Sequence, residues 1–227
     1  MPTNPARPTA EAGDVVHLTI DDAPRPDALR AAIDAVNAQD PRTHETEPLA
    51  LAQGRMAEAW VARLDPDASV ALRLAARAHH LRRWELPRSD YPAGRAGYLR
   101  WRRAQRERHG RDLVAILSAA GEHESVSARA AEIVAKKGLG SDPEVQTFED
   151  AVSLSFLETE LRPVIDRLDD DSKVADIVAK TLAKMSASGR EQVRSLAASL
   201  DERSQSIIAE ARAVYAQHHG HTENTVS

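Results

Sequence analysis

The sequence predicts an all-α protein, a single-domain helical bundle of about eight or nine helices. Apolar residues recur at helical spacing along most of the chain, and no segment shows the alternation of a half-buried strand. Apolar residues make up 42% of the chain, many of them alanine, and only 4% are aromatic, which favours helices and a core of small side chains. With 227 residues, one core of ordinary size is expected, and the sequence does not favour a parallel-sheet fold.

Capping residues, prolines and glycines divide the chain into helices. Pro41 and Pro66 each follow an aspartate and end the first two helices, because proline disfavours helix in the residue before it. Asp67 or Ser69 can cap the third helix, and Asp142-Pro143 has the form of an N-cap followed by proline in the first turn. The expected helices cover residues 27–40, 56–64, 69–81, 96–120, 125–137, 142–163 and 172–189, with two more around residues 193–200 and 201–217.

Four parts of unequal size are expected along the chain. Residues 1–26 contain five prolines and form a mobile leader, in which Val15–Ile20 is either a short strand or unstructured. Residues 27–200 form the helical domain, residues 201–217 a C-terminal helix and residues 218–227 a disordered tail. His218, His219 and His221 of this tail are assigned no function, because a flexible tail offers a metal no supporting contacts.

Composition excludes several classes of function. The chain has no cysteine, so it contains no disulfide, zinc ribbon or thiol nucleophile. It lacks a signal peptide and a long apolar run, so we expect a cytoplasmic protein without a membrane partner. The net charge of −5, with both signs interleaved, gives no overall indication of nucleic acid binding, and the sequence leaves the oligomeric state open.

The segment WELPRSDYPAGRAGY, residues 84–98, is the best candidate for a ligand-binding loop. Pro87 and Pro92 prevent a regular helix there, and the side chains are of types that contact ligands. The arginines of LRRW and GRAGYLRWRR suit an anionic substrate. The alternative is an arginine-rich surface with cation–π packing on Trp84 and Trp101, and the sequence leaves both open.

Polar residues stand at apolar positions of three predicted helices: His79 and His80 on the first of these, His109 on the second and Asp150 on the third. His79 and His80 fall in the last turn of the third helix, where the alternative role is a cation at the negative end of the helix dipole. His109 lies between Trp101 and Leu113 on one helix face, where the alternative is a core histidine with a hydrogen-bond partner.

Asp150 is the polar residue on the third of these helices. It lies in PEVQTFEDAVSLSFLE, with Glu149 beside it expected to face solvent. A buried carboxylate needs a cation, a donor or a metal, and an ion pair with an arginine or with Lys136 would satisfy it. Together, His80, His109 and Asp150 form a reasonable set of ligands for a divalent ion.

Longer motifs resemble a known family. The runs RMAEAW, LRLAARAHHLRRWELPRSDYP, GYLRWR, DPEVQTFEDAVSLSFLE and KMSASGR are similar to the family grouped as DUF4202, over about residues 27–200. Their order is also similar to the HD-domain superfamily of metal-dependent phosphohydrolases. That resemblance implies an HD-like helical fold in which His79-His80 replaces the His-Asp pair, His109 is the downstream histidine and Asp150 the last ligand.

The resemblance implies a hydrolase that acts on a phosphate or related bond of a small anionic or nucleotide substrate. A divalent metal such as Mn, Fe, Zn or Mg would be held by His80, His109, Asp150 and His79 and would activate water. Lys136 and Arg82 would stabilise developing charge, and Glu58 completes the expected catalytic set. The expected substrate-binding residues are Arg55, Arg83, Trp84, Arg88, Tyr98, Arg100, Glu144 and Gln146.

A binding module without catalytic activity is the alternative. Glu58 or Arg55 stands where the superfamily has its first histidine, and His79-His80 departs from the His-Asp pair. These departures favour a protein that holds an anionic small molecule, RNA or a protein partner. Lys184–Ser188, KMSAS, approaches a synthetase motif, but we expect a coincidence because no nucleotide-binding sheet is predicted and Met185 completes an apolar stripe.

Overall fold

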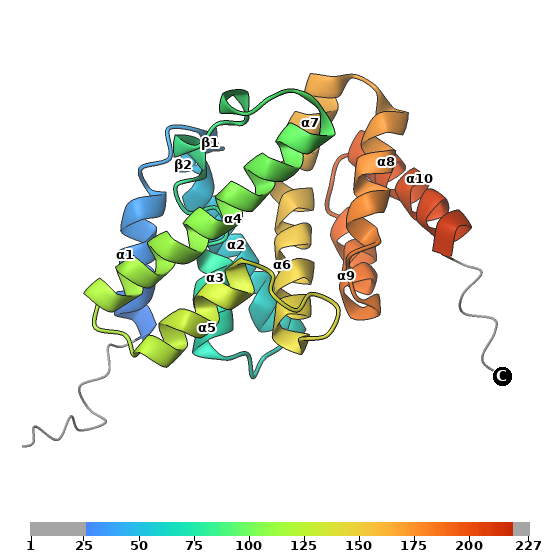
Figure 1. Ribbon diagram of the computed structural model, residues 1–227. Helices are drawn as coiled ribbons and strands as arrows, with labels where there is room; N and C mark the ends of the chain where they lie inside the picture. The colour runs from blue at the N-terminus through green and yellow to red at the C-terminus, as the bar shows by residue number, and fades with distance from the viewer. Residues whose placement is uncertain (1–25, 220–227) are drawn as a thin grey trace, which may run out of the picture.

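The structure, a computed structural model, describes residues 26–219 and consists almost entirely of helices (Figure 1). It confirms the all-α prediction. The elements are α1 (Pro26–Asn37), β1 (Thr43–His44), β2 (Glu47–Pro48), α2 (Leu49–Leu64), α3 (Val70–Arg77), η2 (Arg83–Glu85), η3 (Arg88–Asp90), α4 (Gly94–Ala119), α5 (Glu124–Val134), α6 (Pro143–Thr159), α7 (Leu161–Leu168), α8 (Asp171–Leu182), α9 (Ala187–Ala197) and α10 (Glu202–His219). Residues 1–25 of the predicted leader and His221 lie outside the described residues, whereas Pro26 begins α1.

Two predicted caps are confirmed. The Ser69 side chain accepts a hydrogen bond of 3.1 Å from the backbone N–H of Leu72 at the start of α3. The Asp142 carboxylate accepts bonds from the N–H groups of Glu144 and Val145, with Pro143 in the first turn of α6. These side chains satisfy donors that would have no partner inside the helix, which is why the helices begin there.

Other boundaries differ from the prediction. The predicted helix over residues 142–163 ends at Thr159, and Pro163 lies in the first turn of a separate helix, α7, where its missing N–H costs nothing. The described residues therefore form ten α-helices rather than eight or nine. α2 begins at Leu49, and the short antiparallel pair β1–β2 that precedes it was not predicted. α10 reaches His219, two residues beyond its predicted end.

The end of α3 differs in a way that matters for the site. The helix stops at Arg77, so His79 and His80 lie in the turn that follows it rather than in its last turn. Arg82, at a positive φ of 49°, continues this turn into η2. The backbone in this left-handed conformation redirects the chain away from the α3 axis.

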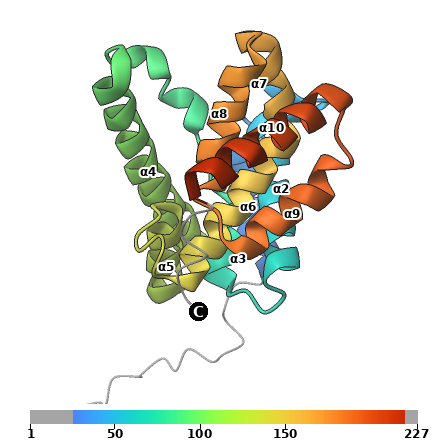
Figure 2. The same ribbon diagram turned by 90° about the vertical axis from the view of Figure 1, so that its right-hand side faces the viewer.

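α6 runs through the middle of the molecule and packs against α2, α3, α5, α7 and α9 (Figures 1 and 2). Phe148, Leu154 and Leu157 of α6 are fully buried in the core, together with Leu72 and Leu74 of α3. α4 packs mainly on α5, and α8 packs mainly on α10. Figure 2 shows α4 on one side of the molecule, apart from α6 and α8. Within residues 26–219, no helix is both long enough and apolar enough to cross a membrane.

Candidate functional site

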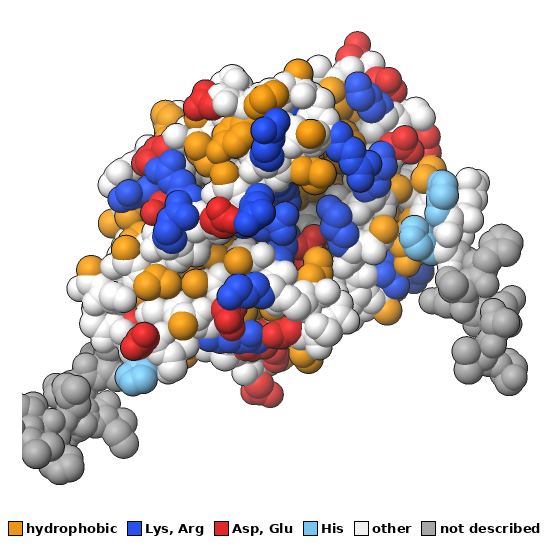
Figure 3. All heavy atoms as spheres, viewed as in Figure 1, with side chains coloured by type: hydrophobic (Ala, Val, Ile, Leu, Met, Phe, Trp, Pro, Cys, Tyr) orange, Lys and Arg blue, Asp and Glu red, His pale blue; other side chains and the backbone are white. Residues whose placement is uncertain are grey.

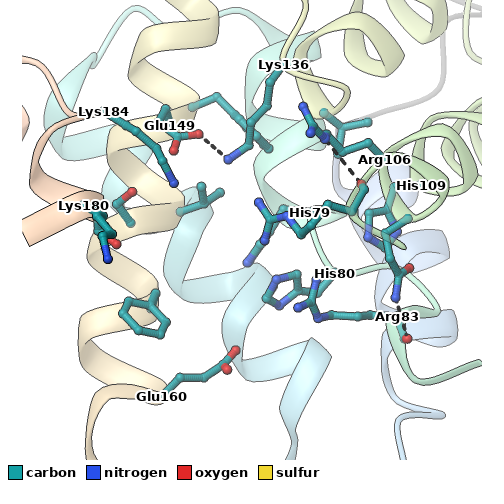
Figure 4. Close-up of a pocket in the computed structure, with 18 of the residues that line it drawn as sticks. His79, His80, Arg83, Arg106, His109, Lys136, Glu149, Glu160, Lys180 and Lys184 are labelled. Carbon is teal, nitrogen blue, oxygen red and sulfur yellow. Dashed lines mark hydrogen bonds and ion pairs between the residues drawn. The ribbon is translucent and has the colours of Figure 1, made fainter. Parts of the chain in front are cut away.

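A cavity of about 870 Å³ lies between α4 on one side and α6 and α8 on the other. The turn after α3, the C-terminal end of α5 and Gln53 of α2 complete its wall. Figure 4 shows Lys180 and Lys184 on one side, Arg83, Arg106 and His109 on the opposite side, and His79 and His80 between them. A volume of this size is typical of sites for small organic ligands.

Basic side chains dominate the wall of this cavity. Two acidic residues, Glu149 and Glu160, also line it. The basic residues that line it are Arg83, Arg95, Arg102, Arg106, Lys136, Lys180 and Lys184. Figure 3 shows Lys and Arg side chains gathered over the middle of the face that carries α4 and α8. Because the whole chain has a net charge of −5, positive charge is concentrated here against the overall balance.

Lys136 is held in place by an unusual backbone conformation. It follows α5 with a φ of 59°, and Lys137 donates a backbone hydrogen bond of 3.1 Å to the carbonyl of Glu132. This is the C-terminal motif in which glycine is usual, so a lysine side chain is accepted here at some cost. The Lys136 ammonium forms an ion pair with Glu149, whose carboxylate is buried rather than solvated as expected (Figure 4). Burial lowers the pKa of Lys136, while Glu149 opposes that shift.

Arg83 has a half-buried guanidinium that forms no ion pair with any carboxylate in the described part of the chain. It lies over the ring of Trp101, with 4.8 Å from the guanidinium carbon to the ring centroid. Burial lowers the pKa of Arg83 to about 10, with the charge of Glu160 opposing the shift. Arg83 thus stays charged at neutral pH and offers its donors to an anion in the cavity.

Two of the three cavity histidines have their Nδ1 atoms fixed by backbone carbonyls. Nδ1 of His79 lies 2.8 Å from the carbonyl oxygen of Ala76, and Nδ1 of His109 lies 2.7 Å from that of Leu81. Since a carbonyl only accepts, Nδ1 carries the proton in each neutral ring and Nε2 keeps its lone pair. Both rings line the cavity.

A series of hydrogen bonds between side chains orients His80. The Gln53 amide nitrogen donates to Glu160 at 2.7 Å and to Thr159 at 3.2 Å, so its oxygen is left to accept from Nδ1 of His80 at 2.5 Å. His80 therefore has the same tautomer as its neighbour, and its ring lies 4.1 Å from that of His79 between centroids. The carboxylate, the amide and the imidazole form one connected relay at the edge of the cavity.

All three imidazoles are neutral near pH 7. Burial lowers the pKa of His79 to about 4 and that of His109 to about 3, and nearby cations, Lys136 for His79 and Arg83 for both, add to the effect. Burial also lowers the pKa of His80 well below its usual value. The histidines therefore act as hydrogen-bond acceptors or weak bases, and the arginines and lysines supply the charge.

Asp150 does not line the cavity, contrary to expectation. Its carboxylate accepts hydrogen bonds from the N–H and the hydroxyl of Ser186, at 2.9 and 2.5 Å, and from Gln146 at 3.2 Å. Ser186 caps α9, and a Cβ added at Gly189 would lie 2.5 Å from the Asp150 Cγ. Asp150 thus anchors the KMSASGR segment, and Met185 of that segment is buried as expected.

The expected metal ligands do not come together. Among residues 26–219, no group of three or more histidines, cysteines, aspartates or glutamates is close enough to hold a metal ion. Asp150 is engaged by Ser186, and the three histidines are not joined by a carboxylate. The residues present therefore do not fit the divalent site that the sequence predicted.

Other expected site residues lie outside the cavity. Glu58 accepts hydrogen bonds of 2.6 Å from both Arg30 and Arg77. Arg55 pairs with Glu47, and Glu144 pairs with Arg129. The contacts of Glu58 connect α2 to α1 and α3, that of Arg55 connects α2 to β2, and that of Glu144 connects α6 to α5. These three residues therefore stabilise the fold.

The proline-rich loop is closed by its own side chains. Arg88 donates to the carbonyls of Tyr91 and Pro92, at 2.7 and 2.9 Å, which fixes the turn before α4. Arg82 lies 4.0 Å from Glu85, Trp84 is half-buried, and Arg100 is exposed on α4. Of the residues 84–98, the cavity is lined by Arg95 and Tyr98.

The sequence pointed to eight of the lining residues and missed other cations. The eight are His79, His80, Arg83, Arg95, Tyr98, Arg102, His109 and Lys136. The missed ones are Arg106 of α4, Lys180 of α8 and Lys184 in the turn after α8. A signal was present, because Arg102 and Arg106 share a helix face with Tyr98 and His109 at spacings of three and four residues. Lys180 of α8 and Lys184 in the turn after it are also four residues apart, but the sequence does not reveal that α8 faces α4.

The comparisons with known proteins give a family and no activity. The family model described as "Domain of unknown function (DUF4202)" matches residues 27–208, which is most of the chain. No curated protein and no solved structure matches the chain.

Proposed function

The chain belongs to the DUF4202 family, and we propose that its members use the cavity between α4 and α8 to bind a small polyanion that carries phosphate groups. The observation that carries the proposal is the half-buried, unpaired guanidinium of Arg83 in a wall with six further cations. A desolvated guanidinium costs free energy unless an anion meets it.

The balance of charge indicates a multiply charged ligand. Of the two acids in the wall, Glu149 is paired with Lys136, and Glu160 is hydrogen-bonded to Gln53. The cations of α4 and those at the C-terminal end of α8 and just after it face the cavity from opposite sides, as Arg106 and Lys184 do in Figure 4. Charge-assisted hydrogen bonds from both sides favour a ligand with several anionic oxygens over one with a single carboxylate.

Two neighbouring arginines of α4 give a matched test. Arg102 lines the cavity, whereas the Arg103 side chain is 81% exposed and pairs with Glu107 on the outer surface. We expect Arg102→Gln to weaken binding of inorganic triphosphate, measured by titration calorimetry at low salt, by about tenfold or more, since a charged hydrogen bond contributes about 1.5–3 kcal/mol. Arg103→Gln should change the affinity by less than about twofold.

The result can contradict the proposal in two ways. Folded wild-type protein with no affinity for inorganic triphosphate would exclude a polyanion site of this kind. Equal effects of Arg102→Gln and Arg103→Gln would show that the ligand follows the general charge of α4 rather than the cavity. Far-ultraviolet circular dichroism of both variants checks that the helices are intact.

Hydrolysis of a phosphate bond by an HD-like enzyme is the second candidate function. It is favoured by three neutral imidazoles, each with a free Nε2 lone pair, at one end of the same cavity. The order of the histidine motifs along the chain supports an HD-like arrangement. In this case His80, oriented by Gln53, would accept a proton from water while Arg83 and Lys136 stabilise the developing charge.

The second candidate is tested by elemental analysis and by phosphate release. Purified protein that carries stoichiometric metal, loses it in His80→Ala and releases phosphate from inorganic triphosphate would support an HD-type enzyme. Metal-free, well-folded protein that binds triphosphate without releasing phosphate would exclude it and leave the binding function. Asp150→Ala should not change the metal content, because Ser186 and Gln146 engage this carboxylate.

A further inference from the structure

Two exposed apolar side chains stand at the edge of the basic cavity. In the described part of the chain, the large apolar residues with substantial exposure are Val70, Tyr98, Leu99 and Leu139. Tyr98 and Leu99 are neighbours on α4, 45% and 52% exposed, and both line the cavity. Single exposed apolar residues need no explanation, but an adjacent pair at the entrance of a ligand-sized cavity does.

The opposite wall is apolar as well. Val152 and Phe156 of α6 and Ile177 of α8 are half-buried and line the same cavity. These side chains keep surface accessible to the cavity instead of burying it fully in the core. The cavity therefore has apolar surface on both sides, next to the cations of α4 and α8.

Tyr98 is linked to the cationic part by Trp101. The two aromatic rings lie 5.9 Å apart between centroids, and Arg83 lies over the same Trp101 ring. Trp101 is nearly buried and donates a hydrogen bond of 2.9 Å to the carbonyl of Leu86, so its position is fixed. The exposed Tyr98 ring and the Arg83 guanidinium are thus both in contact with one fixed side chain, Trp101.

Inorganic anions gain nothing from such a surface, because they are strongly hydrated and offer no apolar area to bury. A flat ring gains from contact with tyrosine, leucine and phenylalanine side chains. We propose that the ligand is an organic phosphate in which the phosphate groups meet Arg83 and the other cations, and a flat ring system packs on Tyr98 and Leu99. This inference rests on the proposed polyanion site and specifies the class of its ligand.

A pair of probes with the same triphosphate group tests the inference. We expect adenosine triphosphate to bind about tenfold more tightly than inorganic triphosphate in metal-free buffer, since stacking on an aromatic side chain has effects of this size. Tyr98→Ala should remove most of this advantage and leave the affinity for inorganic triphosphate within about twofold. Tyr98→Phe, which keeps the ring, should bind both probes as the wild type does.

Two further variants separate the parts of the site. Leu139→Ala removes another exposed apolar side chain that does not line the cavity, and it should change neither affinity. Arg83→Gln should weaken both probes by a similar factor, because the two share the phosphate groups. Thermal melts followed by circular dichroism identify any variant that loses its fold.

The outcomes distinguish the inference from the proposal on which it rests. If both probes bind equally and Tyr98→Ala changes neither, the ring subsite is excluded while the polyanion site remains. If neither probe binds, the polyanion site fails and the inference fails with it. If Tyr98→Ala weakens both probes alike, Tyr98 acts by holding Arg83 in place and the ring subsite is again excluded.

Discussion

Each of the three cavity histidines has its Nδ1–H held by an acceptor and its ring buried close to arginine side chains. A proton added at Nε2 would place a second charge inside a wall that is already positive, without a carboxylate in contact. The same features that leave Nε2 open to a ligand therefore make protonation costly in the folded protein.

The depressed pKa values have a consequence for stability. In the unfolded chain a histidine titrates near 6.5, whereas His79 and His109 titrate near 4 and 3 in the folded protein. Between these values the unfolded state binds more protons, so the free energy of unfolding falls as the pH is lowered from about 6.5 towards 4. Each such histidine contributes a slope of about 1.4 kcal/mol per pH unit at most.

Urea denaturation between pH 7.5 and 4.5 measures this slope. We expect His109→Gln, which keeps a donor near the carbonyl of Leu81, to reduce the slope by close to one proton. His123→Asn is the control, because exposed His123 only caps α5 and asparagine also serves as a cap. Identical slopes for the wild type and His109→Gln would show that His109 already titrates normally in the folded protein.

At this scale the sequence was informative where a residue broke a pattern. His79, His80 and His109 could be predicted as a group because polar side chains at apolar positions require partners. The partner of Asp150 could not be predicted, since Ser186 lies 36 residues further along the chain. Its segment, KMSAS, was explained by the apolar stripe that Met185 completes. Glu58 was likewise conspicuous in the sequence, but its partners Arg30 and Arg77 become visible only after three helices pack.

Among the helices, α9 is attached to α6 through one chain of contacts. The Asp150 carboxylate holds Ser186, and the Ser186 hydroxyl accepts from the N–H of Gly189 at 3.0 Å. The segment between α8 and α9 is fixed further by Gln146, which donates to the carbonyl of Lys184 at 3.0 Å. Because Lys184 lines the cavity, this attachment of α9 also positions part of the cationic wall.

Glycine at position 189 is required by this attachment. A methyl group there would meet the Asp150 carboxylate at 2.5 Å, so Gly189→Ala should lower the free energy of unfolding by about 1–3 kcal/mol, as overpacking does. Gly110→Ala is the matched control, because its added carbon would be 3.6 Å from the nearest atom and alanine is the better helix former. We expect no loss of stability there.

Urea denaturation of both variants checks the comparison. A destabilised Gly110→Ala together with an unchanged Gly189→Ala would show that α9 is not seated on Asp150 as described. Gly189→Ala should in addition weaken triphosphate binding, because a displaced α9 carries Lys184 with it.

Helix starts were predictable where a capping side chain marks them, and helix arrangement was not. Ser69 and Asp142 identified the first residues of α3 and α6 by a local chemical rule. Pro163 was read as a terminator, although the same residue is compatible with the first turn of α7. Nothing in the period of the apolar residues of α4 and α8 says that these helices face each other across the cavity, which is why Lys180 and Lys184 were missed.

At the scale of the whole described structure, residues 26–219, two regions that hold buried charge differ in their partners. Apart from Lys136, the cavity cations form no ion pair within residues 26–219, whereas Glu58, Asp34, Arg30 and Arg77 satisfy one another where α1, α2 and α3 meet. The Arg77 and Glu58 side chains are 14% and 9% exposed, so their ion pair is largely shielded from water. Charge in the second region is committed to the fold, and charge in the first is available to a ligand.

Glu58→Gln tests this division, since Glu58 was expected in the catalytic set. Removal of the carboxylate takes one acidic partner from each of two arginines, although Arg77 keeps Asp34 and Arg30 keeps Asp27. We expect the free energy of unfolding to fall by about 2–3 kcal/mol. The affinity of the folded variant for inorganic triphosphate should stay within about twofold of the wild type, because Glu58 does not line the cavity. Urea denaturation and titration calorimetry on one preparation give both values. A variant of normal stability that no longer binds triphosphate would show that Glu58 belongs to the binding site and not to the ion-pair network of the fold.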